Sequence, residues 1–430
     1  MTAAKPVRAL APFRLRSFRM QWLADLSTSW AFEMETIMLS WYILVETQSV
    51  LLLTLFASTQ YIGTLLSPVF GVMGQRIGNK RVYCAMRACY TTLAAIMMLL
   101  VLTGALTPLY VFIISALLGM VRPSDLVLRY SLIGETMPPN QLMAATSVSR
   151  TTQDSARIMG ALAGAGIVAT LGMGIAYVAV TCLYATSFLL SLRVGGVGGT
   201  AGARPAAHPR TDGEHPERRL PALSLWRDLR QGAAHVWHAP QLLAAMSLAF
   251  LVNLTAFPLT NGLLPYVAKA VYHTDQTGLG YLAASFSFGA LMGSIALSRF
   301  GHALPPARMM IGFCLVWYGM TLIFAQMSGP AGGIPMLILA GLAQSLGMVP
   351  MSAMLLRNSD AQFRGHVMGI RMLMIYGVPI GLLISGPLIS AFSFRATATL
   401  YCVIGLVCTV LIALRWRAHI WNLDAPANKR

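Results

Sequence analysis

Long apolar runs recur along the whole chain and constrain its fold more than any other feature of the sequence. A helix crosses the hydrocarbon core of a bilayer with about 20 apolar residues. Only 10% of the 430 residues are charged, whereas an ordinary soluble domain has roughly 25%. Because backbone polar groups in lipid must bond within their own segment, we expect each run to be a helix. The predicted fold class is an all-α membrane protein with twelve transmembrane helices, at residues 20–45, 49–74, 82–103, 108–133, 141–170, 174–192, 241–270, 277–298, 308–328, 334–356, 363–391 and 395–415.

The positions of Lys and Arg predict which side of the membrane each loop occupies. Of the 31 basic residues, 23 lie in the two terminal segments, the middle segment and the loops on that same side, whereas only Lys269 and Arg395 lie in the opposite loops. Lys and Arg are enriched in cytoplasmic loops. We therefore expect a multi-pass membrane protein with both termini and the middle segment in the cytoplasm. The net charge of +17 predicts no nucleic-acid partner, because the basic residues form no single patch with interleaved aromatic residues.

A polar middle segment divides the chain into two related halves. Residues 193–219 are rich in Gly, Pro and charge, a composition typical of a flexible linker. Residues 223–238 have apolar residues near helical spacing, which predicts an amphipathic helix on the inner membrane surface. The stretches that enter the fifth and eleventh runs resemble each other weakly. The predicted domains are two pseudo-symmetric six-helix halves, 1–192 and 241–430 with its cytoplasmic tail, joined by the cytoplasmic linker 193–240.

Three acidic residues, Asp25, Glu33 and Glu35, lie in the first predicted transmembrane run. A charge near the bilayer centre costs about 2.5–3.5 kcal/mol on insertion scales, so such a residue usually faces a cavity or a partner. Glu33 and Glu35 are about 200° apart on a helix, so both cannot point squarely at one cavity. We expect at least one of them to bind and release protons during transport, with Asp25 as a further candidate nearer the cytoplasm. The alternative is a fixed ion pair with Arg87 or Arg371.

Further charges lie in the fourth and fifth runs. In each run an acid is three or four residues from two arginines, a spacing that places all three on one helix face. We expect a charge network that holds closed states and breaks during transport. Direct substrate contact is the alternative for the fifth-run group, and snorkelling to the membrane surface is the alternative for Arg129. The network candidates are Arg122, Asp125, Arg129, Arg150, Asp154, Arg157 and, in the eleventh run, Arg371.

Polar and aromatic side chains of several runs are candidates for lining a substrate cavity, although packing against lipid or neighbouring helices is the alternative for each. The sequence contains no P-loop, HExxH or GxSxG motif. The six cysteines show no metal-binding spacing. We therefore expect no metal, no cofactor and no enzyme activity. The cavity candidates are Trp30, Gln60, Tyr61, Asn253, Asn261 and Tyr376.

The stretch "GVMGQRIGNKRVY", residues 71–83, resembles the loop after the second helix in the major facilitator superfamily. That loop has a Gly, three residues, an acid, Arg, one residue, Gly and then basic residues. Here Gln75 occupies the acidic position, so the resemblance does not extend to gating by an acid that faces a helix N-terminus. The matching residues are Gly71, Arg76, Gly78, Lys80 and Arg81.

Within the superfamily, the chain is most similar to the bacterial enterobactin-type siderophore and drug exporters. The stretch "FRGHVMGIRMLMIYGVPIGLLISGPL" resembles the eleventh helix of that branch, where an Arg-Gly pair opens a Gly-rich helix. The resemblance implies alternating access between two six-helix halves around a central site.

We expect a secondary transporter that exports a small organic compound, siderophore or drug-like, across the inner membrane by proton-driven antiport. Its expected partners are a small-molecule substrate, membrane lipids and protons, and it is expected to act as a monomer. Two alternatives stay open: a flippase for lysophospholipids or other lipids on the same fold, and a membrane sensor that does not transport.

Overall fold

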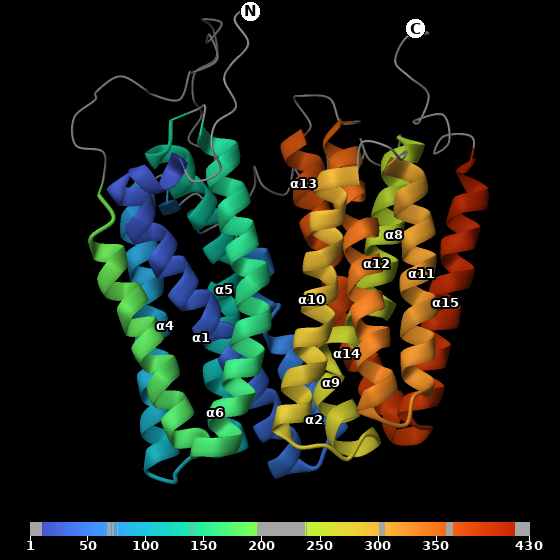
Figure 1. The fold of residues 1–430 in the computed structure, drawn as a ribbon, viewed down its shortest axis with the longest axis horizontal. Helices are drawn as coiled ribbons and strands as arrows, with labels where there is room; N and C mark the ends of the chain where they lie inside the picture. Colours follow the sequence, from blue (N-terminus) through green and yellow to red (C-terminus); the bar gives the residue numbers. More distant parts are fainter. Residues whose placement is uncertain are drawn as a thin grey trace, which may run out of the picture.

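The structure is a bundle of long helices (Figure 1). It is a computed structural model that describes residues 11–66, 70, 73–74, 76–138, 141–195, 237, 239–300, 306–357 and 364–417. These residues are almost all helical and include no β-strand. In the first part of the chain the elements are η1 (Ala11–Arg14), α1 (Arg16–Thr47), α2 (Val50–Thr59), η2 (Ile62–Leu66), α4 (Asn79–Leu102), α5 (Pro108–Thr136) and α6 (Leu142–Leu192).

The second part of the chain contains several interrupted helices. Pro258 and Pro265 each lack a backbone N–H, and here the chain passes through two π turns, η4 and η5. The eleventh run is divided by a 3₁₀ turn, η6. The elements are α8 (Pro240–Phe257), η4 (Pro258–Gly262), α9 (Leu264–Tyr266), η5 (Val267–Val271), α10 (Gln276–Phe300), α11 (Pro306–Gln326), α12 (Pro330–Arg357), α13 (Arg364–Leu373), η6 (Met374–Tyr376), α14 (Gly377–Ala391) and α15 (Phe394–Arg415).

The predicted crossing helices have counterparts in the described part of the chain. Nine helices there are long and apolar enough to cross a membrane, and one of them, Ala144–Leu192, covers both the fifth and the sixth predicted runs. The acid-rich α1 and the shorter apolar helix Val50–Thr64 cover the first two runs. The prediction of an all-α membrane protein is therefore confirmed.

Within α6 the chain reverses direction at Gly172. The sequence predicts two helices with a short gap, whereas the helical path is interrupted only at this residue, with φ 82° and ψ 168°. Residues with a Cβ rarely adopt this region, and glycine does so at little cost. Gly172 therefore allows two antiparallel crossings to follow one another with almost no loop between them.

Each half of the molecule has its own hydrophobic core. One core joins buried residues of α1, α2, α4, α5 and α6, and the other joins α8, α10, α11, α12, α14 and α15 and also includes Val50 of α2. The halves meet where α6 packs on α10 and α2 packs on α14. Gly280 of α10 permits a close approach there, since it lies directly against Ala161 and Ala165 of α6.

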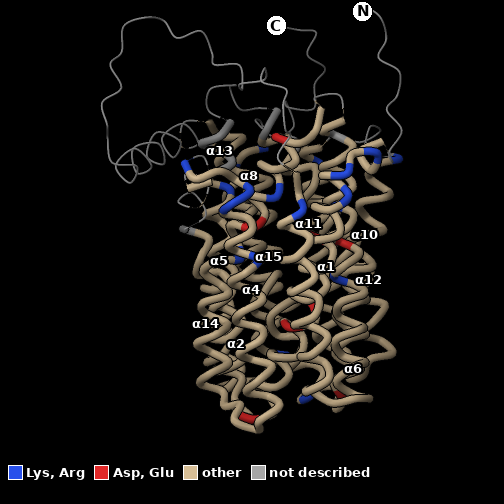
Figure 2. The backbone as a smooth tube through the Cα atoms, turned by 90° about the vertical axis from the view of Figure 1, so that its left-hand side faces the viewer, with Lys and Arg blue, Asp and Glu red and all other residues tan. Residues whose placement is uncertain are grey.

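The halves also contact each other at the end of the molecule where α1 finishes. Lys269 of η5 donates to the backbone carbonyl oxygen of Leu44 in α1 at 3.3 Å. At the other end, where α1 begins and α15 finishes, Figure 1 shows the helices of the two halves diverging. Figure 2 shows that the Lys and Arg residues gather toward this second end. We call it the basic end.

Several predicted features lie outside the described residues. They include Gly71 and Gln75 of the 71–83 loop and all but Trp237 of the expected amphipathic helix at 223–238. Of the linker predicted at 193–240, the structure describes residues 193–195, 237 and 239–240.

Candidate functional site

Four charged side chains meet inside the first half, and we call them the four-charge cluster. The Nη2 atom of Arg87 lies 2.7 Å from Oδ1 of Asp25 and 3.0 Å from Oδ1 of Asp125. Arg129 places its Nη2 atom 2.8 Å from Oδ2 of Asp125 and its Nε atom 3.3 Å from Oδ1 of Asp25. All four side chains are buried. Because the formal charges sum to zero and each ion has a partner, the cluster can remain inside the bundle.

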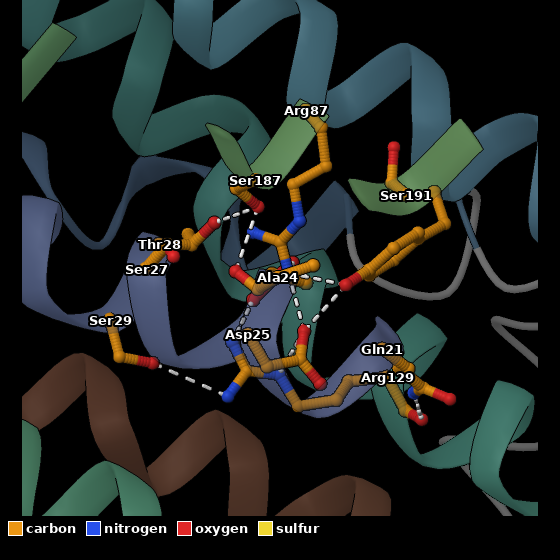
Figure 3. A network of polar contacts seen from close by, with 12 residues as sticks. Gln21, Ala24, Asp25, Ser27, Thr28, Ser29, Arg87, Arg129, Ser187 and Ser191 are labelled. Carbon is orange, nitrogen blue, oxygen red and sulfur yellow. Dashed lines mark hydrogen bonds and ion pairs between the residues drawn. The ribbon is translucent and has the colours of Figure 1, made fainter. Parts of the chain in front are cut away.

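Polar neighbours surround the cluster (Figure 3). The hydroxyl of Tyr83 donates to Oδ1 of Asp25 at 2.6 Å, and its ring lies 4.5 Å from the guanidinium carbon of Arg87. Gln21 donates to the backbone carbonyl of Arg129 at 3.0 Å. These contacts hold α1, α4 and α5 together by polar interactions where an ordinary core uses apolar packing.

Arg87 has a different partner from the one expected. The alternative expected from the sequence was an ion pair with Glu33 or Glu35, whereas Arg87 pairs with Asp25 and Asp125. Their similar depth along the helices could have indicated this pairing, because Asp25, Arg87 and Arg129 each lie within about three helical turns of the basic end. Asp25, Asp125 and Arg129 are all buried.

Glu33 lies at the surface of the first half that faces the second. Its Oε1 atom is 3.8 Å from Nε of Arg157 in α6, and their side chains are 24% and 56% exposed. Gly160, one turn further along α6, lies against the Cβ atom of Glu33. The next residue along α6, Ala161, contacts Gly280 of α10. The Glu33–Arg157 ion pair therefore lies beside the contact between the two halves.

Arg122 does not pair with Asp125, although the spacing of the two residues would allow it. Its Nη1 atom donates to Oε1 of Gln60 at 2.8 Å, and its guanidinium contacts the ring of Phe32. Pro123 lies inside α5 directly after it. Arg122 thus joins α5 to α1 and α2, separately from the four-charge cluster.

Glu35 points into the first half, away from Glu33. It is buried, and its Oε2 atom accepts a hydrogen bond from the hydroxyl of Tyr184 at 3.0 Å. Its Oε1 atom has no hydrogen-bond partner among the described residues. The two carboxylates are in different surroundings, as their helical angle predicts: one lies beside an exposed arginine and one is enclosed among tyrosines.

Arg150 and Arg371 lie on opposite halves toward the basic end. Nε of Arg150 is 3.5 Å from Oδ2 of Asp154, one turn along α6, and the Arg150 side chain is 61% exposed. Arg371, in the last turn of α13, makes no ion pair among the described residues. In the fourth and the fifth run, the acid and two arginines that were expected to form one group therefore take part in separate contacts.

The predicted cavity residues have differing surroundings. Gln60 holds Arg122, and Tyr61 is partly buried near Arg122, Arg157 and Glu33. Tyr376 donates to the backbone carbonyl of Ile62 across the two halves at 3.4 Å. Asn253 is buried and bonds within its own helix, whereas Asn261 is exposed and Trp30 is partly buried.

The structure describes part of the 71–83 loop. Asn79 in this loop donates its amide N–H to Oε1 of Glu135 at 2.6 Å. The described motif residues are the exposed Arg76 and Gly78 together with Lys80 and Arg81.

No group of three or more His, Cys, Asp or Glu residues arranged to hold a metal ion occurs within the described ranges. Asp25 and Asp125, which share Arg87, are occupied by Arg87 and Arg129. The geometry provides partly exposed ion pairs that can form and break.

The sequence profile of the Major Facilitator Superfamily matches residues 22–261 and 246–428. Among curated proteins, none matches the chain. Several solved structures are similar in fold. A bacterial homolog of the human lysosomal transporter Spinster, solved in an inward-facing and unoccupied conformation, has 13% identity and a TM-score of 0.68 over 96% of this chain and 97% of its own.

Two further structures are similar over nearly their whole length. An auto-inhibited peptide transporter of the POT family has 12% identity and a TM-score of 0.71, over 97% of this chain and 99% of its own. A D-xylose–proton symporter has 11% identity and a TM-score of 0.67, over 92% and 96%. At these identities the likeness shows the fold.

Proposed function

This chain belongs to the major facilitator superfamily, and we propose that it exports a small organic compound by alternating access, driven by protons that move inward. Members of this family are transporters and not enzymes. The finer assignment is to the branch of siderophore and drug exporters in the bacterial inner membrane, with the basic end in the cytoplasm. The gathering of Lys and Arg at one end supports that orientation.

The Glu33–Arg157 ion pair is the observation that carries the proton-coupling proposal. A separation of 3.8 Å with a half-exposed arginine is a weak pair that a proton can disrupt, because protonation removes the carboxylate charge that attracts the guanidinium. The pair lies one turn from the contact between α6 and α10. Protonation of Glu33 would therefore act where the halves meet and release Arg157 toward the substrate route.

Glu35 and Asp25 are weaker candidates for this role. Tyr184 encloses Glu35 inside the first half, and Arg87 and Arg129 hold Asp25 in the neutral four-charge cluster. A coupling residue has to meet water from each side in turn, and Glu33 is the most exposed of the three carboxylates. We assign to the four-charge cluster a structural role that keeps α1, α4 and α5 together while the halves move.

Everted membrane vesicles that contain the protein test this function directly. The vesicles are loaded with a pH-sensitive dye, energised, and challenged with candidate siderophores and drug-like compounds. Antiport predicts that an exported compound releases protons from the vesicle lumen, and that Glu33→Gln reduces this release at least roughly tenfold. Glu46→Gln is the matched control, since Glu46 is exposed on the same helix and should leave release unchanged.

Three outcomes would contradict the proposal. Compound movement without proton release would exclude antiport, and normal proton release by Glu33→Gln would exclude Glu33 as the coupling residue. Binding of a compound without movement in either direction would favour the sensor alternative.

A further inference from the structure

Four exposed arginines come from three segments that meet at the basic end of the first half, and we call them the arginine patch. Arg16 and Arg19 lie in the first turn of α1, Arg81 lies in the first turn of α4, and Arg193 directly follows α6. All four side chains are exposed.

A hydrogen bond holds the start of α1 beside the end of α6. The hydroxyl of Ser17 donates to the backbone carbonyl oxygen of Gly195 at 3.1 Å. Arg16 directly precedes Ser17, and Arg193 lies two residues before Gly195. These two arginines therefore belong to neighbouring parts of one surface.

The start of α4 lies beside the same end of α6. The two helices pack against each other, and Oγ of Ser191 is 3.4 Å from Sγ of Cys84. Arg81 is three residues before Cys84, a spacing that places the two side chains on one helix face. Arg193 is two residues after Ser191. Arg81 therefore lies on the same rim of the first half as Arg193.

The positive charge of the arginine patch is largely unbalanced. The segments 11–24, 76–86 and 190–195 contain no Asp or Glu, and none of the four arginines forms an ion pair with a described residue. One exposed carboxylate, Glu135, reaches the start of α4, where Asn79 donates to it at 2.6 Å. Four cations against this single carboxylate leave an excess of positive charge.

Helix ends add to this potential. Two N-termini, of α1 and α4, meet here with one C-terminus, of α6, and no described side chain caps either N-terminus. The free N–H groups of an uncapped N-terminus carry partial positive charge. The backbone therefore favours an anion at the arginine patch, as the side chains do.

The surface that adjoins the arginine patch is apolar. Leu189 and Leu192, in the last turn of α6 before Arg193, are 60% and 50% exposed. Figure 1 shows this part of α6 at the outer edge of the bundle, beside α4. The exposed apolar face of a membrane-crossing helix lies in hydrocarbon, so the arginines directly beyond it lie at the level of the lipid headgroups. An anion at this level is most simply part of a lipid.

We propose that the arginine patch binds the headgroup of an anionic phospholipid, whose acyl chains lie along α4 and the second part of α6. The phosphate oxygens of the lipid accept parallel hydrogen bonds from guanidinium groups. Because the arginines belong to α1, α4 and α6, one bound lipid holds three helices of the first half together at their ends. The inference does not depend on the transported compound or on proton coupling.

Native mass spectrometry of the purified full-length protein tests the proposal. Dioleoyl phosphatidylglycerol and dioleoyl phosphatidylcholine are titrated separately, so that only the headgroup charge differs. The first phosphatidylglycerol is expected to bind roughly tenfold or more tighter than the first phosphatidylcholine. Arg16→Gln, Arg81→Gln and Arg193→Gln should each weaken phosphatidylglycerol binding roughly fivefold, which corresponds to about 1 kcal/mol for each cation at a membrane surface, and leave phosphatidylcholine binding unchanged.

Matched variants separate a site from general attraction. Arg299→Gln and Arg395→Gln remove the same charge from exposed positions in the second half and should leave phosphatidylglycerol binding unchanged. Arg81→Lys retains the charge and should retain most of the affinity. Equal affinity for the two lipids, equal weakening by Arg299→Gln and Arg81→Gln, or unchanged affinity in any one of the three patch variants would overturn the proposal.

Hydrogen–deuterium exchange in nanodiscs locates the site and distinguishes a lipid from free phosphate. Nanodiscs that contain phosphatidylglycerol should slow exchange at the first turns of α1 and α4 relative to phosphatidylcholine nanodiscs, and leave the start of α15 unchanged. Inorganic phosphate added to phosphatidylcholine nanodiscs should have no such effect. Equal protection by inorganic phosphate would assign the arginine patch to a soluble anion and overturn the proposal, as would equal exchange in the two kinds of nanodisc.

Discussion

Arg87 of α4 and Asp25 of α1 form a 2.7 Å ion pair with the Arg87 side chain completely buried. The same guanidinium reaches Asp125 of α5 at 3.0 Å, so one side chain joins three helices of the first half. Removal of one partner from a buried ion pair costs more than the pair contributes, because the remaining charge stays in a medium of low polarity. The four-charge cluster therefore makes the arrangement of α1, α4 and α5 sensitive to single substitutions.

Replacement of Arg87 by Met should destabilise the protein strongly. Asp25 and Asp125 would then share a single guanidinium, and we expect a loss of about 3–5 kcal/mol in the free energy of unfolding. The measurement is the fraction of detergent-solubilised protein that stays monodisperse after heating. Arg193→Met is the control, since Arg193 is exposed at the end of α6. Equal melting of the two variants would show that the cluster does not stabilise the fold.

Neutralising both Asp125 and Arg129 should destabilise the protein less than expected from the sum of the two single substitutions. Asp125→Asn leaves two arginines with one carboxylate, and Arg129→Gln leaves the reverse imbalance. In the double variant the cluster is again electrically neutral, so we expect a favourable coupling energy of about 0.5–3 kcal/mol in a double-mutant cycle of melting measurements. Additive losses would mean that the two residues act independently.

Tyr184→Phe should destabilise the interior of the first half without changing its shape. The substitution removes the hydroxyl that donates to Glu35 at 3.0 Å, and a buried acceptor without its donor costs about 1–3 kcal/mol. Tyr110→Phe is matched in chemistry but exposed in α5, and it should change the melting temperature little. A melting temperature for Tyr184→Phe equal to that of the control would indicate that Glu35 does not need this donor.

Gly280→Ala should impair transport more than stability. The added methyl group would meet Ala165 and the backbone of Ala161 in the other half, so it should disfavour the state in which α6 and α10 touch. Gly319→Ala in α11 has open space around the new methyl group and serves as the control. The check is the initial rate of compound export at equal protein amounts. Equal rates in both variants would exclude a requirement for this close approach.

Lys269→Met should loosen the contact between the halves at the end opposite the basic one. The hydrogen bond to the carbonyl oxygen of Leu44 contributes about 0.5–1.5 kcal/mol. Hydrogen–deuterium exchange at the end of α1 should accordingly increase by roughly two- to twelvefold. Lys269→Arg retains a donor and should restore slow exchange. If the Arg variant exchanges as fast as the Met variant, this hydrogen bond is not what holds the two segments together.

The sequence predicted the membrane crossings well and the partners of the charges less well. Apolar runs show directly where a helix can lie in lipid, and α4, α10 and α15 lie close to their predicted bounds. Spacing along one helix was a weaker guide, since it grouped Arg122 with Asp125 and Arg157 with Asp154. In the structure these arginines contact Gln60 and Glu33 of other helices, because a buried charge takes its partner from whichever helix brings one close.

The amino-acid sequence by itself determined that the chain is helical, that it crosses a membrane repeatedly, and that one side carries nearly all of the loop cations. These properties follow from hydropathy and charge, which are summed over local segments and need no knowledge of neighbours. Only the tertiary structure decided that Glu33 faces Arg157 while Glu35 faces Tyr184, and that Arg87 joins Asp25 to Asp125. Those relationships depend on the rotation and depth of helices far apart in the sequence, and packing of whole helices fixes both.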